Sequence, residues 1–190
     1  MIKTDSVLDA KGLACPMPIV KTKKAMNGLE SGKVLEIQAT DKGSTADLKA
    51  WAQSTGHQYL GTVEEGTVLK HYLRKSSEEE TEEKKYPNVM NNEELEQKID
   101  ANQDTVVLDV REAAEYAFSH IPNAKSIPLD ELDEYLNEFD KESVIHVVCR
   151  TGNRSDFAAQ KLTAAGFKHV INVVPGMSEW TGPTNSDFNN

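Results

Sequence analysis

The sequence predicts an α/β protein of two domains, a two-layer α+β sandwich followed by a central parallel sheet flanked by helices. Three observations support this prediction. The 190 residues suffice for two small domains. The apolar pattern changes along the chain, from strands that alternate in polarity to strands that are continuously apolar. Between the two patterns lies the polar run SSEEETEEKK, which cannot bury a core.

The first pattern predicts the element order β-α-β-α-β-β. Prolines at the start of the first helix and glycines beyond the ends of both helices mark where they begin and end. In order, the expected elements are a strand at 6–9, a helix at 16–30, a strand at 34–40, a helix beginning at 44 or 45 and stopped at 56, and a hairpin of 57–63 and 67–73. We therefore expect one sheet with two helices on one face.

The second pattern alternates helices with buried strands, which is typical of a parallel sheet covered on both faces. The expected strands are 105–110, 143–149 and 169–174. Helices are expected around Leu95 and Ile99, over 113–118, over 129–139 and around Ala158 and Leu162. The resulting prediction is a first domain at 1–75, an acidic linker at 76–88, a second domain at 89–183 and a tail at 184–190.

Composition and charge exclude several classes of function. The net charge is −10, and the first 75 residues hold only 11 Lys and Arg against 8 Asp and Glu, so nucleic-acid binding is not expected. No apolar run is long enough for a membrane span or typical of a signal peptide, so we expect a cytoplasmic protein that does not bind membranes. Two cysteines exclude a disulfide framework and a four-cysteine zinc site, and the histidines show no metal-ligand spacing.

Cys15 is the first candidate nucleophile. Pro16 and Pro18 follow it, so a helix begins about here and Cys15 lies at or near its N-cap. The helix dipole, together with Lys21 and its neighbours Lys23 and Lys24, is expected to stabilise a thiolate. The residues alone leave this interpretation and a buried, inert thiol equally open.

The residues around Cys15 add a family resemblance. LDAKGLACPMPIVKTKKAM closely resembles the signature of TusA-type sulfur-carrier proteins, a CPxP motif preceded by Gly-Leu and followed by a lysine-bearing helix. The resemblance covers about the first 75 residues, including the predicted order of elements. It implies that Cys15 carries a persulfide sulfur received from a donor, and it implies no metal or organic cofactor.

Cys149 is the second candidate nucleophile. It ends a buried strand and opens a loop before a helix, the place where open parallel sheets bind ligands. Backbone N–H groups of such a loop cradle an anion, and Arg150 and Arg154 can orient a small oxyanion. The alternative is a packed thiol with arginines on a solvated surface. The expected loop and donor-binding residues are Arg150, Thr151, Gly152, Asn153, Arg154 and Ser155.

The length of this loop indicates its chemistry. Cys149 and Arg154 have four residues between them, whereas cysteine-dependent phosphatases have five. The shorter loop resembles that of rhodaneses, which hold one sulfane sulfur on cysteine. Further rhodanese-like motifs are LDVRE at 108–112, EY at 115–116, HIPNA at 120–124 and VPGM at 174–177 with Trp180. This resemblance covers roughly residues 89–183.

Some residues depart from the rhodanese pattern or have structural interpretations. Ser119, Asn123 and Pro175 stand where the family often has glycine, and Asn123 is a mild change because asparagine tolerates positive φ. Asp109 and Arg111 are interpreted as a structural ion pair or cap, and His146 as a core histidine.

The two resemblances together imply a TusA-like carrier fused to a rhodanese. Cys149 would take sulfur from thiosulfate or a low-molecular-weight persulfide and pass it to a thiol or sulfur-carrier acceptor, Cys15 being the attractive one. The alternative is a redox or reactive-sulfur sensor that works through a Cys15–Cys149 disulfide without turnover. A phosphatase or arsenate reductase is disfavoured by the loop length, and a homodimer remains open.

Overall fold

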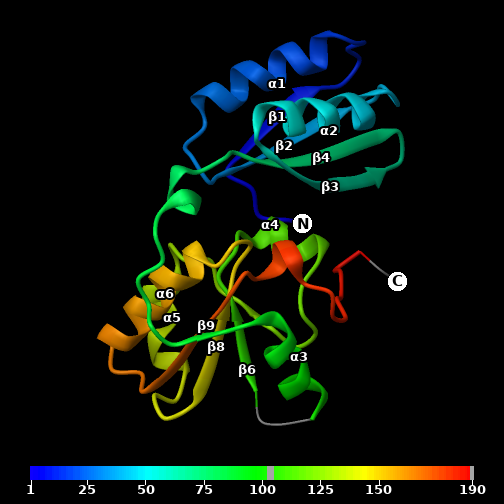
Figure 1. The fold of residues 1–190 in the computed structure, drawn as a ribbon. Helices are drawn as coiled ribbons and strands as arrows, with labels where there is room; N and C mark the ends of the chain where they lie inside the picture. The colour runs from blue at the N-terminus through cyan, green and yellow to red at the C-terminus, as the bar shows by residue number, and fades with distance from the viewer. Residues whose placement is uncertain (102–104, 189–190) are drawn as a thin grey trace. The chain divides into compact units, whose positions relative to one another are not determined.

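A computed structural model describes residues 1–101 and 105–188 of the chain. The chain divides into two compact units, Met1–Ser77 and Glu78–Asn190, each with its own sheet (Figure 1). None of the helices in the described part has the length and apolar character that a bilayer crossing requires.

The first unit is the predicted two-layer sandwich. Its elements are β1 (Ser6–Ala10), α1 (Met17–Gly28), β2 (Val34–Ala39), α2 (Ser44–Thr55), β3 (Gln58–Glu65) and β4 (Val68–Arg74). The sheet has the order β1-β2-β4-β3, with β1 parallel to β2 and the other pairs antiparallel. Figure 1 shows both helices on the same face of this sheet. The predicted element order and layering are therefore confirmed.

Helical spacing explains how the two helices cover the sheet. In α1 the side chains of Pro18, Thr22 and Met26 are buried, and in α2 those of Leu48 and Ala52 are buried. Residues four apart lie on one helical face, so each helix presents one stripe to the sheet. Met26, Leu48 and Ala52 pack in one apolar cluster with the strand residues Leu35, Ile37 and Leu73.

A polar network around His71 lies inside this first unit. The His71 side chain is buried, with Nε2 2.9 Å from Ser44 Oγ and Nδ1 3.0 Å from the Tyr59 hydroxyl and 2.9 Å from Thr62 Oγ1. Burial lowers the pKa of His71 to about 4. The imidazole is therefore neutral at pH 7. The sequence pattern did not single out this network, because its members come from three separate elements.

The second unit is a five-stranded parallel sheet with helices on both faces. Its strand order is β5-β9-β8-β6-β7. The elements are η1 (Glu78–Thr81), β5 (Val89–Met90), α3 (Asn92–Asp100), β6 (Val106–Asp109), α4 (Ala113–Phe118), β7 (Lys125–Ser126), α5 (Leu132–Tyr135), η2 (Leu136–Glu138), β8 (Val144–Val148), α6 (Asn153–Ala164), β9 (His169–Val173) and η3 (Met177–Glu179). The predicted parallel sheet is confirmed. It gains two edge strands, β5 and β7, that are too short to show an apolar pattern.

Alternation along β8 separates the two cores of the second unit. Ile145, Val147 and Cys149 belong to the cluster that includes residues of α5 and α6. Val148 belongs to the other cluster, with Leu95 of α3. Successive side chains of a strand point to opposite faces, so Cys149 lies on the α6 side of the sheet.

The predicted helix at 129–139 and the predicted core histidine His146 had different outcomes. The helix predicted over 129–139 was wrong in extent: α5 makes a single turn and continues as the 3₁₀ turn η2, a common ending for an α-helix. His146 is a core histidine, as interpreted. It is buried, its Nδ1 lies 3.2 Å from the Val106 carbonyl oxygen, and burial lowers its pKa.

Candidate functional site

The fold places Cys149 directly after β8, at the carboxyl end of the central strand of the parallel sheet. The loop that follows leads into α6, whose N-cap is Gly152 with φ 88°. A Cβ atom at Gly152 would lie 2.9 Å from Lys84 Cε and 3.2 Å from a methyl of Val174. The left-handed backbone favours glycine here, and a side chain would also have to displace the end of Lys84.

Two polar groups contact the sulfur of Cys149. The Gly152 N–H donates to Sγ at 3.1 Å, and Ser155 Oγ lies 3.3 Å from it. Cys149 and Ser155 are both 0% exposed, so water does not compete for these contacts. Hydrogen-bond donors fixed at an atom stabilise negative charge that develops on it during a reaction. The arrangement suits a thiolate or the terminal sulfur of a persulfide.

The C-terminal motif holds the backbone of this loop. The Met177 N–H donates to the Cys149 carbonyl at 2.8 Å, and the Ser178 N–H donates to the Arg150 carbonyl at 2.8 Å. Gly176 has φ 92°, and a Cβ there would collide with the Cys149 carbonyl oxygen. The chain keeps the glycine at the position where the backbones approach, so Pro175 before it is tolerated. Asn123 has φ 64°, the positive φ foreseen for it.

Arg154 forms a buried ion pair with the carboxylate of Glu115. Its two terminal nitrogens donate to the Glu115 carboxylate at 2.6 and 3.0 Å, and the side chains are 5% and 0% exposed. Burial would lower the pKa of Arg154, but attraction from Glu115, Cys149 and Glu80 raises it. Among the described residues, no hydrogen-bond partner exists for Arg154 Nε. One guanidinium donor is therefore left beside the cysteine loop.

Arg150 forms an ion pair with Glu80, a residue of the acidic run between the two sequence patterns. Arg150 donates to Glu80 at 3.1 Å, and Arg154 donates to the other Glu80 oxygen at 3.4 Å. Glu80 thus bridges the two arginines that the sequence assigned to an incoming anion. The remaining loop side chains, Thr151 and Asn153, contact each other at 3.3 Å.

Further contacts attach residues 78–86 to the second unit. Asn153 Nδ2 donates to the Glu82 carbonyl at 2.6 Å. The backbone N–H groups of Lys85 and Tyr86 donate to Asp156 Oδ1 at 3.0 and 2.8 Å. We call residues 78–86 the acidic strap. Sequence reasoning missed its contacts because a polar, glutamate-rich run has the composition of a solvated linker.

Asp109 and Arg111 form the structural ion pair expected of them. Arg111 and Asp109 are bonded at 2.7 Å, with side chains 6% and 1% exposed, and Arg111 also donates to the Ser119 carbonyl at 2.7 Å. Sequence reasoning missed the role of Glu115, which it met only within the EY motif. The EY motif was the available signal, because a carboxylate that becomes buried needs a cation as its partner.

Cys15 has a different environment. It is exposed and lies in the turn between β1 and α1, one residue before Pro16, the N-cap of α1. The turn is held by the Gly12 N–H, which donates to Thr40 Oγ1 at 2.9 Å, and by the Met17 N–H, which donates to the Ala14 carbonyl at 3.0 Å.

The expected thiolate stabilisation at Cys15 was wrong in direction. A hydrogen bond with the Asp47 side chain raises the pKa of the Cys15 thiol, and partial desolvation and the charges of Asp47 and Asp41 raise it further. These carboxylates come from α2 and the turn before it, far along the chain from Cys15. Folding brings them next to the thiol, so their effect outweighs that of the lysines on α1.

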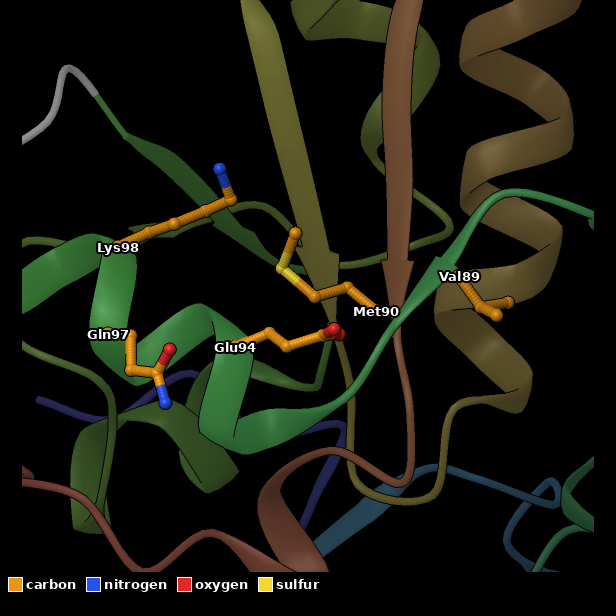
Figure 2. A pocket seen from close by; sticks show the side chains of 5 residues that line it. All are labelled: Val89, Met90, Glu94, Gln97 and Lys98. Carbon is orange, nitrogen blue, oxygen red and sulfur yellow. The ribbon is translucent and has the colours of Figure 1, made fainter.

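The second unit also has a surface hollow of about 520 Å³ between β5 and α3 (Figure 2). Its lining residues are Val89, Met90, Glu94, Gln97 and Lys98. None of the described residues that line it is a cysteine.

Comparison with known proteins covers both units. Residues 6–75 match the family Sulfurtransferase TusA, and residues 91–183 match the Rhodanese-like domain. The chain is 54% identical over 184 residues to YrkF of Bacillus subtilis (strain 168), a candidate sulfur carrier protein, covering 97% of this chain and 100% of YrkF. The chain belongs to the YrkF family. It therefore joins a TusA-type sulfur-carrier domain to a rhodanese-like domain.

Separate relatives match each half of the YrkF-type chain. The Sulfur carrier protein TusA of Allochromatium vinosum is 46% identical over 77 residues, which are 40% of this chain and 100% of that protein. The crystal structure of a Rhodanese-like Domain Protein from Staphylococcus aureus is 33% identical with a TM-score of 0.50, and it covers 53% of this chain and 98% of its own. The predicted fusion of two sulfur-handling domains is thus confirmed.

Proposed function

We propose that the chain is a sulfurtransferase in which Cys149 accepts sulfane sulfur and Cys15 receives it from Cys149. The donor is thiosulfate or a low-molecular-weight persulfide. The observation that carries the proposal is the pair of groups on the buried Cys149 Sγ, the Gly152 N–H and the Ser155 hydroxyl, at a four-residue loop closed by Arg154.

The loading step begins with attack of the Cys149 thiolate on the outer sulfur of thiosulfate. A new S–S bond forms between Sγ and that sulfur, the S–S bond within thiosulfate breaks, and sulfite leaves with the electron pair. With an organic persulfide as donor, a thiolate leaves instead. The Gly152 N–H is placed to stabilise the negative charge of the Cys149 persulfide, as donors of an oxyanion hole do.

The delivery step regenerates Cys149. The Cys15 thiol loses its proton to water, its thiolate attacks the outer sulfur of the Cys149 persulfide, and the S–S bond at Cys149 breaks. Cys15 then carries the persulfide, and no net oxidation occurs. Because Asp47 and Asp41 raise the pKa of Cys15, the thiolate fraction available for this step at neutral pH is lowered.

The proposal assigns a different role to each of the two domains. Residues 1–75 carry sulfur and residues 89–183 load it, with 76–88 between them and 184–190 after them. The TusA and rhodanese-like matches support this division, and the exposed position of Cys15 supports delivery onward to a thiol of another protein.

Intact-protein mass spectrometry after brief thiosulfate treatment tests the proposal. Wild type, Cys149→Ser and Cys15→Ser are compared under non-reducing conditions, and each added sulfur is mapped by proteolysis. We expect Cys15→Ser to gain one sulfur on Cys149, and Cys15 to gain sulfur only where Cys149 is present. Sulfur on Cys15 in Cys149→Ser would contradict delivery from Cys149. A loss of two hydrogens without added sulfur would indicate the disulfide sensor instead.

A further inference from the structure

The two arginines beside Cys149 are both paired with the carboxylate of Glu80. Arg150 and Arg154 are the cations beside Cys149 that an anionic donor would use, and both are bonded to Glu80. The Glu80 side chain is 11% exposed, so its carboxylate is largely removed from water and held against the two arginines. An ion pair of this burial is weakly screened by salt.

The two arginines, already paired with carboxylates, offer little net attraction for an anion. Arg154 is neutralised by Glu115 and Arg150 by Glu80, so two arginines face two carboxylates. A dianion such as thiosulfate must then displace Glu80 or bind with a carboxylate close by. Like charges in partly buried surroundings repel each other by amounts that change binding constants several-fold or more.

The acidic strap is built to hold Glu80 in this position. Glu80 lies in η1. On the C-terminal side of Glu80, the Glu82 carbonyl accepts a hydrogen bond from Asn153. The N–H groups of Lys85 and Tyr86 donate to Asp156. Lys84 lies over Gly152, the residue whose N–H contacts the sulfur. The strap thus contacts the loop itself.

We propose that Glu80 is a specificity-determining residue that competes with small anionic sulfur donors for Arg150 and Arg154. The site then discriminates against the thiosulfate dianion and in favour of organic persulfides, whose persulfide group carries at most one negative charge. This inference rests on the proposed function of Cys149 as the sulfur acceptor. It assigns a role to a segment whose composition indicates only a linker.

A pair of alkylating reagents tests the charge discrimination without any sulfur donor. Iodoacetate is an anion and iodoacetamide is neutral, and both form an S–C bond with the Cys149 thiolate as iodide leaves. The rates are measured in a Cys15→Ser background, where Cys149 is the only thiol. The ratio of the iodoacetate rate to the iodoacetamide rate cancels changes in the reactivity of the thiolate and in general access to it.

The expected result is a rise in this ratio of about fivefold or more on Glu80→Gln, because one nearby negative charge is removed. Glu83→Gln is the matched control, since it makes the same charge change on an exposed strap residue, and it should leave the ratio at the wild-type value. Glu80→Asp keeps the charge and should stay near wild type. Equal increases in both rates for Glu80→Gln, or no change in the ratio, would overturn the proposal.

Steady-state kinetics with cyanide as acceptor connect the inference to turnover. Glu80→Gln should lower the KM for thiosulfate about fivefold or more while kcat changes little, and it should lower the KM for an organic persulfide with no other charged group by a smaller factor. If Glu80 had only a structural role, Glu80→Gln would change the KM values for both donors by the same factor. If no variant gains sulfur on Cys149 from any donor, the proposed function fails, whereas the alkylation ratio tests Glu80 independently.

Discussion

Cys149 and Cys15 lie in the same chain but in opposite surroundings. Cys149 is buried in a loop that directs an N–H and a hydroxyl at its sulfur, with a carboxylate-bound arginine beside it. Cys15 is exposed in a turn, and the carboxylates of Asp47 and Asp41 raise the pKa of its thiol. Hydrogen-bonding groups therefore face the first sulfur, whereas carboxylates that favour the protonated thiol lie near the second.

This difference fits the two stages of the transfer that we propose. A sulfur that must attack a donor needs its negative charge stabilised in advance, which requires fixed dipoles and exclusion of water. A sulfur that must be handed on needs to be reachable, and an exposed turn meets that need. The carboxylates near Cys15 lower its thiolate fraction, and the thiolate is the nucleophile.

The largest effect should come from exchanging the nucleophiles themselves. Cys149→Ser should reduce sulfite release from thiosulfate with cyanide as acceptor by about 10³-fold or more, because a serine hydroxyl is not ionised at neutral pH. Cys15→Ser should retain sulfur loading at Cys149. Colorimetric thiocyanate and sulfite assays measure both. Comparable losses in the two variants would break the distinction between a loading and a receiving cysteine.

The buried ion pair supplies the next largest effect. Glu115→Gln removes the closer of the two carboxylates that balance Arg154, and the second unit should lose about 3 kcal/mol of unfolding free energy, because the buried charge then keeps only its 3.4 Å contact with Glu80. Urea unfolding followed by Trp180 fluorescence in a Trp51→Phe background measures it. Asp133→Asn, which removes an exposed partner of Lys161, is the control and should cost less than about 1 kcal/mol.

The first unit should show a pH dependence that comes from His71. Its pKa of about 4 in the folded state lies below the value of about 6.5 in the unfolded chain. Unfolded protein therefore binds more protons between these values, and stability falls as pH decreases from 6.5 to 4, by about 3 kcal/mol in total. Trp51 fluorescence during urea unfolding in a Trp180→Phe background measures this. Equal stability at pH 7 and pH 4.5 would show that His71 is not a neutral buried group.

The smallest effect concerns the reactivity of Cys15. Asp47→Asn removes the carboxylate that raises the Cys15 pKa, so the thiolate fraction and the rate of iodoacetamide alkylation at pH 7 should rise about threefold. The measurement uses a Cys149→Ser background and a pH series. Asp9→Asn, on β1 and absent from the causes of the Cys15 shift, serves as control. A lower rate in Asp47→Asn would mean that the carboxylate activates Cys15.

Much of the fold follows from local patterns. Prolines after Cys15 and glycine at Gly56 mark helix ends, and β8 is identified by its continuous apolar run. The spacing of Cys149 and Arg154 indicates the loop because loop length is a property of adjacent residues. The single helix expected at 129–139 was wrong, since the choice between an α-helix and a 3₁₀ turn there depends on packing.

By itself, the sequence determined the two domain types, the order of their elements and the two cysteines, because periodicity, turn residues and motif spacing are local. Only the tertiary structure decided the electrostatics around each sulfur. Asp47 reaches Cys15 from another helix, and Glu115 and Glu80 reach Arg154 from 39 and 74 residues away. Charge interactions depend on distance in space, and a sequence shows only distance along the chain.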